Sequence, residues 1–371
     1  MPIDFLKLGK HAQWLCLCLW TIAIVPAEAY QLRVAVTQKI DRVKIAASTA
    51  AIVSDGSGKK LGELAPAQGS IVQVSNDDQV KFGDTPAAAL WVKPQQGGYV
   101  WIEDRWYRGA VKVIPTDKKL LAINYVDLEQ YLYSVLGAEM SPDFPAEALK
   151  AQAIAARTYA LYRSQSTSKK LFDVDSSESS QVYRGLSSEA NTTQTAVNDT
   201  IGQIMTYRGK PILAVFHAAS GGHTENVEDV WSSPIPYLRG VPDYDLGTPG
   251  YEWSKTFSLS ELSQSLKVNN IKSIATDRMT QFGSVMSLKI VGDRDTILDG
   301  KQIRSALKLR SLRFIISSTP TGYVFTGRGY GHGLGMSQWG AYSMAQQGMN
   351  YANILTHYYQ GIDLGKLAAK K

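Results

Sequence analysis

The hydrophobic period of the chain changes near Asp127, and this change restricts the fold more than any other feature of the sequence. From residue 30 to about residue 116, apolar and polar residues alternate in short runs such as LRVAV (32–36), separated by turn residues. Runs of this kind predict β-strands. Longer segments with a helical period follow Asp127. The sequence therefore predicts an α+β fold, with a β-rich N-terminal region (30–116) and a mixed α/β domain (117–366) that has an alanine-rich helix and a glycine-rich loop.

The first part of the mixed domain predicts two consecutive helices. A capping box at Asp127 begins a helix over residues 128–136, and Gly137 suits its C-terminus. A loop that contains Glu139 follows. Pro145 suits the first turn of a second, alanine-rich helix that continues to about residue 165. The serine-rich segment 164–188 is predicted to be an exposed loop. A loop glutamate is usually a solvated surface residue, but in a poorly solvated cleft its carboxyl could serve as a general acid.

Two cations share one stripe of the second helix with apolar residues. Lys150, Ile154, Arg157 and Leu161 are spaced so that they lie on one helical face. In one interpretation, Lys150 and Arg157 face a substrate groove. In the other, both side chains extend along the protein and place their charged ends in solvent.

The N-terminus has the pattern of a secretory signal. Lys7 and Lys10 precede the apolar run WLCLCLWTIAIV (14–25), and an A-x-A site ends at Ala29. We therefore expect residues 1–29 to be a signal peptide and the mature chain to be exported to the cell envelope, the periplasm or the extracellular wall. An uncleaved membrane anchor is the alternative. The two cysteines of the chain, Cys16 and Cys18, lie inside this segment, so the mature chain would have no disulfide and no thiolate ligand.

The net charge of +6 suits polyanionic surroundings such as nucleic acid, anionic lipid or an anionic cell wall, but charge alone favours a mildly basic surface without such a partner. No nucleic-acid-binding motif is present, so we expect no nucleic-acid partner.

Two further segments combine glycine with histidine. The segment FHAASGGHT (216–224) contains His217 and His223, and acidic residues follow it. Read as metal ligands, these are only two imidazoles with no thiolate to complete the set, although a metal-dependent hydrolase remains an alternative. The segment GRGYGHGLG (327–335) has glycine at every second position and does not match a nucleotide-binding loop. Its His332 has little local packing, which favours a functional role. We expect no metal and no cofactor.

Three long motifs follow one another along the chain. They are YLYSVLGAEM followed by PAEALKAQAIAARTYAL (131–161), FHAASGGHT followed by EDVW and PYL (216–238), and GRGYGHGLGMSQWGA followed by HYYQG (327–361). In this order they resemble the motifs of the stage II sporulation protein D / amidase enhancer (LytB) family of peptidoglycan-active proteins. The resemblance covers about two thirds of the chain, from about residue 111 to about residue 364. It implies a sporulation protein D-like catalytic domain over residues 117–366.

The resemblance also implies a function and a set of site residues. The expected activity is lytic transglycosylase cleavage of peptidoglycan glycan strands from which stem peptides have been removed, with Glu139 as the catalytic acid. A single carboxylate suffices when the sugar's own 6-hydroxyl attacks, whereas glycoside hydrolases usually need two. The alternative is a non-catalytic wall-binding enhancer of an N-acetylmuramoyl-L-alanine amidase, which would make a cell-wall amidase a partner. Some members bind zinc through histidines and cysteines, and this chain has no cysteine there. The expected substrate-binding residues are Lys150, Arg157, Ser220, His332, Gln338 and Trp339.

Overall fold

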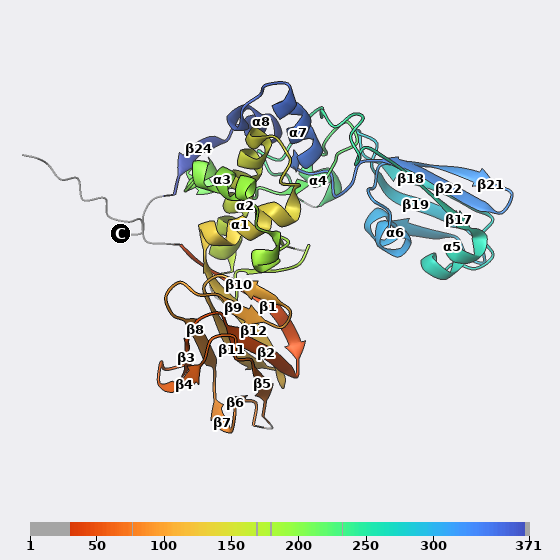
Figure 1. The fold of residues 1–371 in the computed structure, drawn as a ribbon. Helices are drawn as coiled ribbons and strands as arrows, with labels where there is room; N and C mark the ends of the chain where they lie inside the picture. The colour runs from red at the N-terminus through yellow and green to blue at the C-terminus, as the bar shows by residue number, and fades with distance from the viewer. Residues whose placement is uncertain (1–29, 76, 168–169, 179, 232, 368–371) are drawn as a thin grey trace, which may run out of the picture.

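The computed structural model describes residues 30–75, 77–167, 170–178, 180–231 and 233–367. The predicted signal peptide lies outside these residues. The fold is α+β with a strand-rich N-terminal region, as predicted (Figure 1). Among the described residues, no helix is both long enough and apolar enough to cross a membrane.

The N-terminal region consists of two sheets that share one hydrophobic core. One sheet has the strand order β13-β1-β12-β11-β8-β3-β4, and the other has the order β10-β9-β2-β5-β6-β7. Buried Leu32 and Val34 of the first sheet and Val43 and Ile45 of the second belong to the same apolar cluster. The strands are β1 (Gln31–Ile40), β2 (Arg42–Ala47), β3 (Ala51–Asp55), β4 (Lys60–Leu64), β5 (Ser70–Val74), β6 (Val80–Phe82), β7 (Thr85–Ala87), β8 (Leu90–Pro94), β9 (Val100–Ile102), β10 (Arg105–Tyr107), β11 (Ala110–Thr116), β12 (Lys119–Asp127) and β13 (Val174–Asp175).

The first helix begins where the sequence predicts and ends three residues later than expected. The Asp127 side chain accepts hydrogen bonds from two backbone N–H groups of the first turn of α1 (Leu128–Glu139). Gly137 does not end this helix. Its lack of a side chain instead allows the Ser188 backbone to pack closely against α1, since a Cβ atom there would lie 1.9 Å from the Ser188 carbonyl oxygen. Glu139 is therefore the last residue of α1 rather than a loop residue.

The alanine-rich helix α2 (Ala146–Ser166) lies at the centre of the middle part of the molecule (Figure 1). All of its alanines except Ala146 are buried, which allows its neighbours to pack closely on several sides. The other elements of this part are η1 (Gly185–Ser188), α3 (Asn191–Asp199), β14 (Gln203–Tyr207), β15 (Lys210–Pro211), β16 (Phe216–His217), α4 (Val227–Val230), β23 (Met336–Ser337), α7 (Gln338–Gln346), α8 (Tyr351–Tyr358) and β24 (Asp363–Lys366).

A separate lobe interrupts the middle part between residues 252 and 328. It has two three-stranded sheets and its own apolar core, which includes Leu262, Ile303 and Phe325. Figure 1 shows it extending to one side of the helices. The elements of the lobe are β17 (Glu252–Ser258), α5 (Leu259–Leu266), β18 (Ser273–Met279), β19 (Val285–Val291), β20 (Thr296–Asp299), α6 (Gly300–Leu307), β21 (Phe314–Thr319) and β22 (Gly322–Arg328).

Candidate active site

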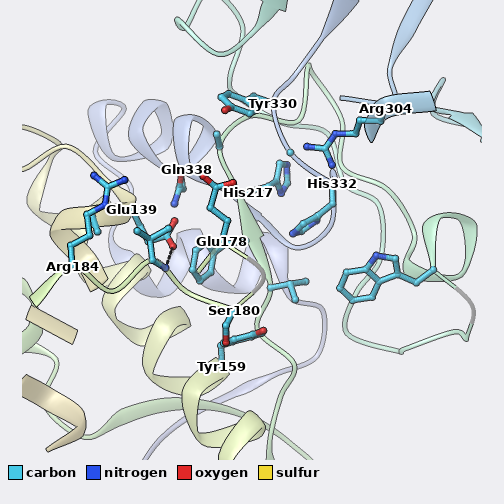
Figure 2. A pocket seen from close by; sticks show the side chains of 17 residues that line it. Glu139, Tyr159, Glu178, Ser180, Arg184, His217, Arg304, Tyr330, His332 and Gln338 are labelled. Carbon is cyan, nitrogen blue, oxygen red and sulfur yellow. Dashed lines mark hydrogen bonds between the residues drawn. The ribbon is translucent and has the colours of Figure 1, made fainter. Parts of the chain in front are cut away.

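Glu139 lies on the wall of a cavity of about 580 Å³ (Figure 2). The cavity walls come from α1, from the segment after β13, from β16, from α6 of the lobe and from the glycine-rich segment. The backbone N–H of Val182 donates a hydrogen bond of 2.8 Å to Oε1 of Glu139. The residues around the cavity are Ala138, Glu139, Tyr159, Glu178, Ser180, Val182, Arg184, Val215, Phe216, His217, Ala218, Trp231, Arg304, Tyr330, Gly331, His332 and Gln338.

The surroundings of Glu139 favour its protonated form. Burial raises the pKa of its carboxyl above the usual value, and the negative charge of Glu178 adds to this rise. The Val182 N–H, the Gln338 amide and the positive charge of Arg184 oppose the rise in pKa. The result is a carboxyl group that keeps its proton to a higher pH than an exposed glutamate and that faces a cavity.

Gln338 and His332 line the same cavity, and their role in substrate binding stays a prediction. Gln338 begins α7 and is buried beside Glu139. The Nδ1 atom of His332 accepts a hydrogen bond of 3.0 Å from the Leu334 N–H. Burial lowers the pKa of His332 to about 3, so the ring is neutral near pH 7.

The glycine-rich segment brings His332 next to His217. Strand β23 pairs in parallel with β16, and the two rings lie 5.3 Å apart. This close pairing requires Gly331, which has φ +125° and where a Cβ atom would lie 2.6 Å from the His217 Cβ. The alternating glycines therefore allow two chain segments that are more than 100 residues apart to pack closely against each other.

Arg157 and Lys150 do not lie at the cavity, which corrects the expectation that their stripe faces a substrate groove. The guanidinium of Arg157 is fully buried and forms two hydrogen bonds, of 2.8 and 2.5 Å, with the Glu129 carboxylate. Lys150 forms ion pairs with Glu147 (3.3 Å) and Asp199 (3.2 Å). Arg157 does not reach solvent, so the other interpretation fails for it. The ammonium of Lys150 pairs with partly exposed carboxylates, so Lys150 does place its charged end at the surface.

Ser220 and Trp339 are also held by neighbours outside the cavity. The Ser220 hydroxyl is buried and donates a hydrogen bond of 2.6 Å to the Asp243 carboxylate. The Trp339 ring packs on Phe144 and Tyr342, with centroid distances of 4.8 and 5.3 Å. These contacts give both residues a packing role, and neither lines the cavity around Glu139.

The comparisons with known proteins agree with the three motifs. A family model described as stage II sporulation protein matches residues 116–207, which contain α1, Glu139 and α2. Stage II sporulation protein D of Bacillus subtilis (strain 168) is 36% identical over 266 residues, which cover 67% of this chain and 77% of that protein. The chain belongs to the stage II sporulation protein D family. An uncharacterized protein of Brachyspira hyodysenteriae is 38% identical over 264 residues, which cover 70% of this chain and 72% of the relative.

Two further matches were found for this family member. The amidase enhancer of Bacillus subtilis (strain 168) is 30% identical over 293 residues, which cover 63% of this chain and 40% of that protein. A model described as a domain of unknown function matches residues 244–335, which include the whole lobe and His332.

Several residues at the cavity of this sporulation protein D family member were not identified from the sequence. Glu178, Ser180 and Arg184 lie in the serine-rich segment that we expected to be an exposed loop, and the structure places that segment beside Glu139. Arg304 comes from the lobe. Since these residues belong to no motif, only the tertiary fold reveals them.

The histidines do not form a zinc site of the kind that some family members have. Among the residues that the structure describes, no group of three or more histidine, cysteine, aspartate or glutamate side chains is placed to hold a metal ion. His217 faces His332, whereas His223 stacks on Phe282 at a centroid distance of 3.9 Å. Two imidazoles without a third ligand do not fit the usual coordination of zinc.

Proposed function

We propose that this protein is an exported peptidoglycan-remodelling enzyme that cleaves glycan strands as a lytic transglycosylase, with Glu139 as its acid and base. Membership of the stage II sporulation protein D family implies a role at the cell wall. The observation that carries the proposal is the position of Glu139: a carboxyl with a raised pKa on the wall of a cavity of about 580 Å³.

The reaction needs one proton donor that later accepts a proton. The protonated carboxyl of Glu139 gives its proton to the glycosidic oxygen as the bond from that oxygen to the anomeric carbon breaks. The carboxylate then takes the proton of the 6-hydroxyl group of the same sugar while that oxygen bonds to the anomeric carbon. The product is a 1,6-anhydro sugar, and no water is consumed. The Val182 N–H, 2.8 Å from Oε1, stabilises the carboxylate between the two steps.

Glu178 is the other carboxylate at the cavity, and its environment differs from that of Glu139. Its side chain is exposed to solvent. This carboxylate could activate a water molecule only if it lay opposite the acid across the bound sugar. The products of the reaction distinguish the two mechanisms, because hydrolysis would give reducing ends.

The test is mass spectrometry of the products formed from peptide-free glycan strands. Wild-type protein is expected to give 1,6-anhydro ends, which are lighter than reducing ends by about one water. Glu139→Gln keeps the size of the side chain but cannot transfer the proton, so the rate should fall by about 10²–10⁴-fold. Glu178→Gln should still give anhydro ends. Cleavage by Glu139→Gln at the wild-type rate would refute the proposed role of Glu139.

A second candidate function is enhancement of an N-acetylmuramoyl-L-alanine amidase without cleavage by this chain. The similarity to the amidase enhancer of Bacillus subtilis favours it. This candidate predicts that wild type and Glu139→Gln both leave peptide-free strands intact and both stimulate a cell-wall amidase to the same extent.

Export of the chain is tested separately, since residues 1–29 are outside the described part. Sequencing of the mature protein from the envelope fraction should begin at Tyr30. A mature protein that retains the apolar run 14–25 would indicate an uncleaved membrane anchor.

A further inference from the structure

Arg304 is a cation at the cavity with no ion-pair partner in the described chain. It lies on α6 of the lobe, and its side chain is half-buried. Its Nε donates to the Leu309 carbonyl (3.3 Å) and its Nη2 to the Arg310 carbonyl (3.1 Å), and no hydrogen bond of its Nη1 to another described residue is found. Burial without a nearby carboxylate lowers its pKa. Arginines with reduced hydration are usually paired with an anion, so this position lacks its counter-charge.

His217 has the complementary feature, an acceptor without a donor. Its Nδ1–H donates a hydrogen bond of 3.0 Å to the Leu334 carbonyl, which leaves the lone pair on Nε2. The Nε2 atom is buried and has no hydrogen-bond partner among the described residues. Burial lowers the pKa of the ring to about 4, so His217 is neutral near pH 7. A buried acceptor without a partner is costly unless a ligand supplies the missing N–H or O–H group.

The two groups lie on the same cavity wall. Both line the cavity that contains Glu139, and the charge of Arg304 contributes to the low pKa of both His217 and His332. Figure 2 shows the guanidinium of Arg304 on the same side of the cavity as the two imidazole rings, away from Arg184. The cavity thus offers a charged donor and a neutral acceptor side by side.

We propose that Arg304 and His217 form a subsite for an N-acetylated sugar that carries a free carboxylate. Arg304 binds the carboxylate, and Nε2 of His217 accepts a hydrogen bond from the neighbouring acetamido N–H or hydroxyl of the same sugar. The subsite rests on the proposed function and deepens it, because it names the residues that recognise the sugar acid. A stem peptide joined to this carboxylate through an amide bond removes the negative charge, so the subsite favours strands without peptides.

Arg184 is the other cation at the cavity, and it is less suited to this role. Its side chain is exposed to water, which screens its interaction with a ligand. Arg304 is half-buried, so its attraction for a carboxylate is screened less. The lobe therefore supplies the group that selects the substrate, while α1 supplies the proposed acid.

The test measures binding rather than cleavage, in a Glu139→Gln background that keeps the strands intact. The ligands are peptide-free glycan strands and the same strands with their carboxylates converted to methylamides. The parent protein, Glu139→Gln, should bind the strands with free carboxylates about 10- to 100-fold more tightly than the methylamide strands, as expected for a hydrogen bond to a charged group. Arg304→Gln should remove this preference, and Arg304→Lys should keep part of it. Lys272→Gln, which removes an exposed charge of the same lobe outside the cavity, is the matched control and should keep it all.

The methylamide strands also report whether a variant is folded. If Arg304→Gln only disrupted α6 and the cavity, binding of both kinds of strand would fall together. The proposal is overturned if the parent protein binds both strands equally, or if Arg304→Gln keeps the preference for carboxylates. It is also overturned if Lys272→Gln loses the preference to the same extent. If the wild-type protein did not cleave glycan strands, the proposed enzymatic function would be refuted. The binding preference would not be affected, because binding is measured without turnover.

Discussion

Replacing Arg157 with alanine should destabilise the protein strongly without changing the cavity. The side chain is fully buried, and its guanidinium donates to both Glu129 oxygens and to the carbonyls of Gln203 (3.1 Å) and Val197 (3.3 Å). Removing one member of a buried ion pair typically costs about 3–5 kcal/mol. Because Glu129 is 17% exposed and can regain some water, we expect a loss of about 3 kcal/mol in the free energy of unfolding.

The assay is urea unfolding followed by tryptophan fluorescence, with Lys150→Ala as the control. The pairs of Lys150 with Glu147 and Asp199 are partly exposed, so the control should lose at most about 1 kcal/mol. The double variant Arg157→Met with Glu129→Met should recover part of the stability, because no buried charge is left unpaired. Wild-type stability in Arg157→Ala together with a loss of glycan binding would refute this reasoning and restore Arg157 as a ligand contact.

Three other perturbations test the site by its stability. Burial raises the pKa of Glu139, so the native state loses stability as the pH rises from the ordinary carboxyl pKa through the raised pKa. Glu139→Gln should therefore melt at a higher temperature than wild type near pH 7. Calorimetry should show that this difference vanishes in acid. The pKa of His217 is lowered from 6.5 to about 4, so the unfolded state binds the proton first. This group should lower the free energy of unfolding by about 3 kcal/mol from pH 7 to pH 4. In urea unfolding at each pH, His217→Gln should remove this contribution, whereas the contribution of His332, whose pKa is also lowered, should remain. Gly331→Ala would place a Cβ 2.6 Å from that of His217 and should lower the melting temperature by several degrees, whereas Gly365→Ala, with open space around it, should not.

Local signals in the sequence predict local structure well in this chain. The alternating runs correspond to the two N-terminal sheets, and the Asp127 cap begins α1 because its side chain satisfies free N–H groups of the first turn. Gly137 misled the prediction of the helix end. Its lack of a side chain accommodates Ser188, and no sequence pattern reveals a contact between segments some 50 residues apart.

The candidate site, too, could be predicted from the sequence only in part. Glu139, His332 and Gln338 belong to motifs, and they meet at one cavity. The helical spacing correctly placed Lys150 and Arg157 on one helix, but the prediction that they face a substrate groove was wrong. Periodicity cannot distinguish a helix face that lines a groove from one that packs on carboxylates. Arg304 was missed since its contribution depends on how the lobe sits beside the glycine-rich segment.

The lobe begins and ends at adjacent positions, since Glu252 at the start of β17 pairs with Arg328 at the end of β22. A self-contained insertion whose ends meet can be exchanged with little disturbance of its host. Helix α1 and its glutamate belong to the host, whereas Arg304 belongs to the insertion. We therefore expect that a different insertion between residues 252 and 328, acquired in evolution or by engineering, would change which glycan the chain binds and leave the proposed reaction at Glu139 unchanged.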